Sequence, residues 1–171
     1  DDASCMNLNK ISLPSVLGVN ADALEQAQFE VGDNIFNADR RELFHLIRKP
    51  LAEDTYPAIV DATVLMWSLG KQLGDTLHYS THDGRALRII PVATFTGSIF
   101  HGNILIDSEL FDKAWPENNG CNIFLVRSSE SNDMKQYLQQ SLYEYGIRVT
   151  PTRERLETIN EVTDTYLSIF M

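Results

Sequence analysis

Residues 56–69 read YPAIVDATVLMWSL, an apolar run followed by an aspartate and then by a second apolar stretch. A short apolar run of this kind is typical of a buried strand, so we expect a strand at 57–60. Aspartate is favoured at the start of a helix, because its carboxylate accepts hydrogen bonds from the first backbone N–H groups. Asp61 therefore predicts a helix at 62–69, which ends at Gly70.

After this helix the sequence alternates between strand and turn signals. Three further strands are expected, at 76–81, 86–94 and 103–106. Asp83-Gly84 is a strong hairpin signal between the first two of them. Pro91 lacks a backbone N–H, which predicts a sheet edge or a bulge. Residues 56–106 are therefore interpreted as a β-rich unit with one inserted helix.

The flanking regions mix helices and strands. Helices are expected at 21–28, 39–48, 109–114 and from Ser131 or Asn132 to Tyr145, with Asn20 or Asp22 capping the first and Ser108 the third. Strands are expected at 16–19, 121–126 and 147–149, and a bent strand that is broken at 32–34 is expected at 29–36. The uninterrupted apolar run CNIFLV at 121–126 predicts a strand buried on both faces. We therefore expect an α+β fold with an α/β unit at 121–171.

The charge of the chain argues against some classes of partner. Its 24 acidic residues outnumber 14 Lys and Arg, which gives a net charge of −10. Binding to phosphate groups needs clustered Lys and Arg, so a nucleic-acid partner is not expected. No stretch approaches the roughly 18 apolar residues of a membrane-spanning helix.

No motif in the chain assembles a catalytic or metal site. His78 and His82 would meet only if a turn folded His82 back, and no base or nucleophile stands at a spacing that implies a pair with His101. Phosphate-binding glycine loops and the GxSxG motif are absent from the sequence. We therefore expect no cofactor and no metal, and the pattern favours binding or mechanics over catalysis.

The last stretch, 150–171, reads TPTRERLETINEVTDTYLSIFM. Apolar residues recur there every three or four positions, at Leu156, Ile159, Val162, Tyr166 and Ile169. This period predicts an amphipathic helix. Two interpretations stay open, a terminal helix docked on a core and a helix that continues into a membrane.

Several of these segments together resemble one protein family. They are DDASCMNLNK at 1–10 with VLGV at 16–19, YPAIVD at 56–61, LGKQLGDTL at 69–77, LRIIPVA at 87–93, SIFHGNILI at 98–106, and RL at 155–156 with NEVTDTYLSIF at 160–170. Their order and spacing resemble the extracytoplasmic (periplasmic) domains of FtsX-like ABC-transporter permeases, which include the macrolide exporter MacB and the lipoprotein-releasing LolC and LolE. Residues 25–55 match the pattern least.

The resemblance implies a MacB-like fold held outside the cell membrane between two membrane helices. A small α/β (porter-like) subdomain next to the membrane would comprise residues 1–30 and 117–171, and a β-rich (sabre-like) outer subdomain residues 31–116. Family members hydrolyse ATP on a separate cytoplasmic subunit or domain, so this domain is expected to be non-catalytic. With the resemblance, the interpretation of the terminal helix as a membrane connection is favoured.

The resemblance also suggests site residues and partners. The membrane-proximal segment that transmits motion would be Tyr166, Leu167, Ile169 and Phe170. From the sequence alone, because loops carry function more often than a core does, Ile99, Phe100 and His101 are expected to form either an exposed contact loop or a buried turn with Phe100 in the core. Expected partners are the chain's own transmembrane helices, the cytoplasmic ATP-binding subunit or domain, and a periplasmic protein or lipoprotein cargo. The isolated domain is expected to be a monomer, and the complete permease a dimer.

An alternative from another class is a stand-alone soluble small-ligand-binding protein or hydrolase that uses His101 or His82. A cleft with convergent polar groups would favour it. Cys5 and Cys121 would form a disulfide if the compartment is oxidising, and two buried free thiols are an equal alternative.

Overall fold

The structure, a computed structural model, describes residues 13–118, 120–128 and 131–159. Its contacts divide the chain into two compact units. The sheet unit comprises residues 1–96 and 100–119, and the C-terminal unit comprises residues 97–99 and 120–171. The predicted mixture of helices and strands is confirmed. The boundary near residue 120 places 13–30 with the sheet, whereas the sequence grouped residues 1–30 with 117–171.

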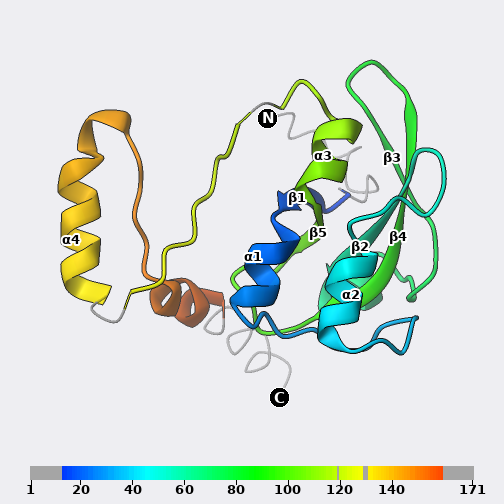
Figure 1. Ribbon diagram of the computed structural model, residues 1–171, viewed down its shortest axis with the longest axis horizontal. Coiled ribbons are helices and arrows are strands. Elements are labelled where there is room, and N and C mark those ends of the chain that lie inside the picture. Colours follow the sequence, from blue (N-terminus) through cyan, green and yellow to red (C-terminus); the bar gives the residue numbers. More distant parts are fainter. Residues whose placement is uncertain (1–12, 119, 129–130, 160–171) are drawn as a thin grey trace, which may run out of the picture. The chain divides into compact units, whose positions relative to one another are not determined.

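A curled, mixed sheet of five strands organises the sheet unit (Figure 1). The strands are β1 (Ser15–Val19), β2 (Thr55–Asp61), β3 (Leu77–Ser80), β4 (Ala86–Phe95) and β5 (Asn103–Asp107), in the spatial order β1-β5-β2-β4-β3. The β1/β5 and β2/β4 pairs are parallel, and the β2/β5 and β3/β4 pairs are antiparallel. Each strand that the sequence predicted within 56–106 is present.

The central strand β2 is buried along its whole length, as expected for a strand that is covered on both faces. Its partner β4 carries a bulge, because Ala58 pairs with Pro91 while the next residue, Ile59, pairs with Ala93. The bulge predicted from Pro91 is therefore confirmed. The other predicted alternative, a position of Pro91 on an edge strand, is not found, since β4 lies between β2 and β3.

The hairpin between β3 and β4 turns at Asp83-Gly84, as predicted. Thr81 closes it, because its backbone N–H donates to Arg85 O at 2.9 Å and its hydroxyl accepts from Arg85 N at 2.9 Å. The Thr81 hydroxyl also donates to the Asp83 carboxylate. That hydrogen bond is the main reason why the pKa of Asp83 lies below its usual value.

Each helix of the sheet unit begins after a capping side chain. The helices are α1 (Ala21–Gln26), α2 (Arg40–Leu46), a turn at 62–68 that contains the π-helix η2 (Val64–Ser68), and α3 (Ser108–Ala114). The capping residues are Asn20, Asp39, Asp61 and Asp107. The predicted cap Ser108 is wrong by one residue, because the Asp107 carboxylate accepts from Glu109 N at 3.1 Å.

The core lies on both faces of the sheet. Val60, Ile104 and Ile106 belong to a cluster that includes Val64 and Leu65 of the 62–68 turn. Ile59 and Leu105 are equally buried and alternate with these residues along their strands, so they face the other way. Helix α3 packs against β1 and β5. Gly18 permits this approach, since a Cβ there would lie 2.7 Å from the Cβ and Cγ of Phe111.

The strand predicted at 29–36 is wrong. Residues 32–35 instead run beside the second half of β4, where Asn34 and Ala93 form a single isolated bridge. Gly32 N donates to Thr94 O at 2.7 Å and Ile35 N to Val92 O at 2.9 Å. The Gly-Asp-Asn sequence at 32–34 favours turns, which limits the pairing to these contacts.

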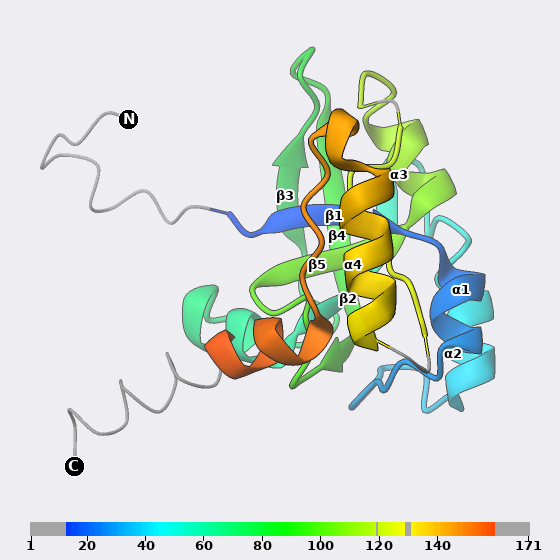
Figure 2. The ribbon, with the colours of Figure 1, turned by 90° about the vertical axis from the view of Figure 1, so that its left-hand side faces the viewer.

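The C-terminal unit contains α4 (Ser131–Ser141), the 3-10 turn η3 (Tyr143–Tyr145) and a helix at 152–159. Figures 1 and 2 both show the segment 146–150, in orange, running beside α4. The strands predicted at 121–126 and 147–149 are wrong, because neither segment pairs with a strand in the described residues. An apolar run forms a strand only when its backbone groups find partners, and composition cannot supply them.

Candidate functional site

The carboxylate of Asp61 is the most connected buried charge in the sheet unit. It lies at the end of β2 with 1% of the residue exposed. Oδ1 accepts from Thr63 N at 2.8 Å and Val64 N at 3.3 Å, which caps the 62–68 turn. Oδ2 accepts from Gly102 N at 3.2 Å and lies 2.8 Å from Nδ1 of His101. We call these five residues the Asp61 cluster.

The turn before β5 presents His101 to the carboxylate. Gly102 has a φ of +85°, a conformation that glycine adopts without strain. The side-chain amide of Asn103 donates to Phe100 O and His101 O at 3.1 Å each, which fixes the backbone on both sides. The short distance to the carboxylate places the proton of a neutral imidazole on Nδ1. Nε2 then has no partner in the part of the chain that the structure describes.

Of the predicted contact loop, only His101 presents an exposed side chain, which is 41% accessible. Phe100 is buried, and its ring packs edge-on against Phe29, which in turn packs against Phe95. Ile99 is half-buried. Of the two predicted alternatives, the buried turn with Phe100 in the core is therefore correct for Phe100. Only the ring of His101 remains as an exposed contact surface in this loop.

The sequence did not reveal Asp61 as a partner of His101. It predicted Asp61 only as a helix cap, which is correct for Oδ1. The second oxygen reaches Gly102, 41 positions along the chain, because β5 returns beside β2 in the sheet. A usable signal was that an aspartate directly after a fully buried strand has two oxygens to satisfy, and a cap satisfies only one of them.

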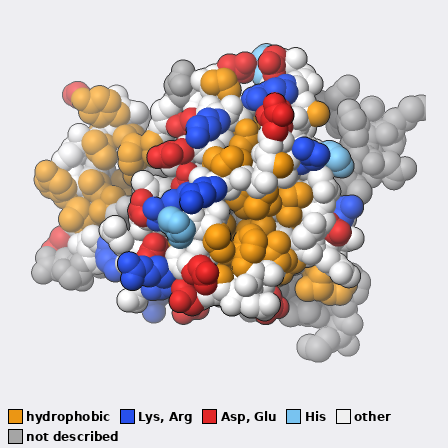
Figure 3. Space-filling model, turned by 45° about the vertical axis from the view of Figure 1, so that its right-hand side comes forward, with side chains coloured by type: hydrophobic (Ala, Val, Ile, Leu, Met, Phe, Trp, Pro, Cys, Tyr) orange, Lys and Arg blue, Asp and Glu red, His pale blue; other side chains and the backbone are white. Residues whose placement is uncertain are grey.

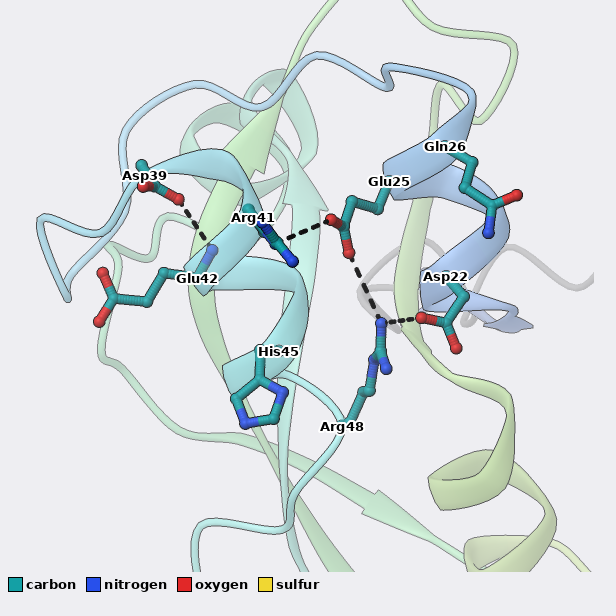
Figure 4. Close-up of a pocket in the computed structure, with 8 residues that line it drawn as sticks. All are labelled: Asp22, Glu25, Gln26, Asp39, Arg41, Glu42, His45 and Arg48. Atoms are coloured by element: carbon teal, nitrogen blue, oxygen red, sulfur yellow. Dashed lines mark hydrogen bonds and ion pairs between the residues drawn. The ribbon is translucent and has the colours of Figure 1, made fainter.

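A second polar site is the groove between α1 and α2, with a volume of about 620 Å³ (Figure 4). Its lining residues are Asp22, Glu25, Gln26, Asp39, Arg41, Glu42, His45 and Arg48. Arg48 pairs with Asp22 and lies 3.6 Å from Glu25, and Arg41 lies 3.9 Å from Glu25. These ion pairs link α1 to α2 across the groove, so its geometry supports helix–helix packing. Within the described residues, Arg48 Nε is buried and has no hydrogen-bond partner.

Asp107 lies beside this helix pair and has a raised pKa. Burial of its carboxyl group is the main cause, and the nearby Glu109 adds to it. Backbone hydrogen bonds from Glu109 and Ala21 and the charge of Arg48 act in the opposite direction. The pKa of Tyr79 is raised to about 12 by burial, and its hydroxyl donates to Pro14 O at 2.7 Å. Both groups tie β-strand ends to neighbouring segments, which is a structural role.

Among the described residues, the predicted site residues His82 and Cys121 have no contact with the Asp61 cluster. Tyr166, Leu167, Ile169, Phe170 and Cys5 lie outside the described residues, so their roles stay predictions. Cys121 is a free, exposed cysteine, and the predicted bond to Cys5 also stays a prediction. His82 is exposed at the β3/β4 turn. Neither the α1/α2 groove nor a groove along α4 is lined by His82 or His101.

The face drawn in Figure 3 shows no block of one charge. On the face in Figure 3, Lys and Arg side chains lie next to Asp and Glu side chains. Among the residues that the structure describes, no group of three or more His, Cys, Asp or Glu side chains is placed to hold a metal ion. Within the same residues, no helix combines the length and the apolar character that a membrane crossing requires.

Comparisons of the chain with models of protein families, with curated proteins and with solved structures found no match. The function is therefore argued from the residues and the geometry given above.

Proposed function

We propose that this chain is the extracytoplasmic domain of an FtsX-like, MacB-like ABC-transporter permease. In this proposal the domain is non-catalytic, and it couples the motion of membrane helices to a cargo or partner protein outside the membrane, in export or in lipoprotein release. ATP is hydrolysed by a cytoplasmic subunit or domain of the same transporter.

The observation that carries the proposal is that the family-like segments within the described residues contact one another in the fold. The YPAIVD segment ends in Asp61, which accepts from Gly102 of the SIFHGNILI segment at 3.2 Å. Gly74 of the LGKQLGDTL segment donates to Pro91 O of the LRIIPVA segment at 2.8 Å. The VLGV segment lies in β1 and pairs with β5. Segments that resemble the family by their order and spacing thus lie in one connected structure.

The proposed mechanism is mechanical and uses the C-terminal unit. Its helix at 152–159 leads towards residues 160–171, the segment proposed to connect to the membrane. Axial movement of this helix would be passed to the rest of the domain. The finer assignment of porter-like and sabre-like subdomains is part of the same proposal.

The orientation in the membrane can be tested through Cys121, because its thiol is exposed. The full-length protein in its own cells, with Cys5→Ser, is treated with a membrane-impermeant maleimide after any outer barrier has been removed. We expect labelling of intact cells that is lost in the Cys121→Ser variant. Labelling only after lysis would refute the extracytoplasmic location. The permease assignment further requires that the detergent-extracted protein co-purifies with an ATP-hydrolysing subunit or domain.

The second candidate function, a small-ligand-binding protein or hydrolase, is favoured by one observation. The buried Asp61 carboxylate orients the His101 ring and leaves Nε2 open to solvent. A catalytic histidine that acts as a general base is oriented by a carboxylate in the same way. A hydrolase of this kind would lose its activity on a panel of esters and amides in His101→Ala, whereas the permease domain would show no activity in either form.

A further inference from the structure

The turn between β3 and β4 contains the only Asp-Gly pair in the chain, Asp83-Gly84. In such a pair the backbone nitrogen of the glycine can attack the aspartate side chain, because glycine has no Cβ that hinders the approach. A bond forms between Gly84 N and Asp83 Cγ, a C–O bond of the protonated carboxyl group breaks, and water leaves. Water then opens the succinimide ring. Opening at the α-carbonyl gives isoaspartate, in which the backbone runs through the side chain of residue 83.

Thr81 holds both groups that take part in this reaction. The nitrogen is engaged, since Gly84 N donates to Thr81 O at 3.1 Å. The carboxylate is engaged as well, because the Thr81 hydroxyl donates to Asp83 Oδ1, and Arg85 N lies 3.4 Å from the same oxygen. Loss of water requires the protonated acid, and the hydrogen bond from Thr81 lowers the pKa of Asp83 and so keeps it ionised.

We propose that Asp83-Gly84 is a latent site of isoaspartate formation, which Thr81 keeps unreactive as long as the hairpin is closed. Every contact that protects the pair joins residues within 81–85, so the protection does not depend on how the two units of the chain are arranged. The reaction needs only water and no other component. This inference is independent of the proposed transporter function and goes beyond it.

Conversion at this turn should release β3 from the sheet. Isoaspartate adds one atom to the backbone of the turn, which disturbs the register that pairs Ser80 with Ala86. Among the described strands, β3 has β4 as its single neighbour, so no second strand holds it in place. The buried Leu77 side chain would leave the core together with the strand. A transient opening of the hairpin could thereby become a permanent change.

The rate of conversion measures the protection. The full chain is incubated at neutral pH, either folded or unfolded in guanidinium chloride, and is then digested with trypsin. The peptide 72–85 contains Asp83 and also Asp75, which precedes a β-branched threonine and serves as an internal reference. The aspartate and isoaspartate forms have the same mass and are separated by chromatography. Conversion at Asp83 should be at least about tenfold slower in the folded chain, because local opening must precede it.

Thr81→Val keeps the branched shape of a buried side chain and removes its hydroxyl. If conversion follows the population of the open hairpin, loss of one hydrogen bond of about 1.4 kcal/mol should accelerate it about tenfold. Ser80→Ala is the matched control, because the Ser80 hydroxyl makes no hydrogen bond within the described residues. It should convert at the rate of the original chain. In guanidinium chloride all three chains should convert alike.

The outcomes that would overturn the proposal are distinct. Equal rates in the folded and unfolded original chain would show that the site is not latent. A folded Thr81→Val chain that converts no faster than Ser80→Ala would remove the role of Thr81. Amide hydrogen exchange of the isolated isoaspartate form tests the consequence for the sheet. Exchange at 77–80 should be faster than in the unconverted chain, and unchanged exchange would refute the release of β3.

Discussion

Replacing Asp61 tests whether its carboxylate holds the 62–68 turn and the turn before β5 together. In Asp61→Ala the turn loses its cap, which costs about 1 kcal/mol. The part-buried N–H of Gly102 loses its acceptor, which costs about 1–3 kcal/mol. The hydrogen bond from His101 adds up to about 1 kcal/mol, because that ring is partly exposed and can turn to water. The free energy of unfolding should therefore fall by about 2–5 kcal/mol.

Two further variants separate these contributions. In Asp61→Asn the amide oxygen still caps the turn, and the amide nitrogen faces the Gly102 N–H as a second donor. We expect a loss of about 1–3 kcal/mol. His101→Ala should cost less than about 1 kcal/mol, because three backbone donors still satisfy Asp61.

Urea unfolding followed by tryptophan fluorescence measures these differences. Both tryptophans, Trp67 and Trp115, lie in the sheet unit, so the signal reports the unit that contains Asp61. The reasoning is refuted if Asp61→Ala unfolds within about 0.5 kcal/mol of the original chain, or if His101→Ala costs as much as Asp61→Ala.

Three further predictions concern packing and protonation. Gly18→Ala should lower the free energy of unfolding by about 1–3 kcal/mol, because the new Cβ meets the base of the Phe111 side chain at 2.7 Å; the same urea experiment measures this, and an unchanged midpoint would contradict it. Tyr79→Phe should cost about 1 kcal/mol through the lost hydrogen bond to Pro14. The stability that Tyr79 contributes through its raised pKa is complete below pH 10 and is lost as the pH rises through about 12. Burial also raises the pKa of Tyr56, so the phenol absorbance of the original chain should show one more late-ionising tyrosine than that of Tyr79→Phe. Because the pKa of Asp107 is raised in the folded protein, its contribution to stability is complete when the pH is below the ordinary pKa of 3.8 and is lost as the pH rises through the raised pKa. Asp107→Asn keeps the cap of α3 and should make the free energy of unfolding less dependent on pH above 3.8. Unfolding experiments at pH 4 and pH 7 would show this difference.

Local chemistry explains why much of the sheet unit could be predicted. Asp83-Gly84 and the caps at Asn20 and Asp61 act over three or four residues, so a reader of the sequence sees both partners at once. The bulge opposite Pro91 follows from its missing N–H in the same way. These features needed no knowledge of the sheet order.

The remaining features depend on partners that are distant in the chain. The strand order places β5 between β1 and β2, and no periodicity encodes that arrangement. The contact between Asp61 and His101 follows from it, so the sequence predicted each residue without the pair. At 121–126 composition predicted a strand, but strand formation needs a neighbour that the described chain does not provide.

The position of β1 has a consequence for how the protein is made. β1 leaves the ribosome first among the strands, yet its hydrogen-bonded neighbour β5 begins at Asn103. At about 5–20 residues per second, β1 waits on the order of ten seconds for that neighbour during synthesis. Non-local pairing of this kind slows folding, and the exposed VLGV edge is a site where a chaperone or a neighbouring nascent chain can bind. The N-terminal strand is thus synthesised first and can be fixed in the sheet only after β5 has emerged.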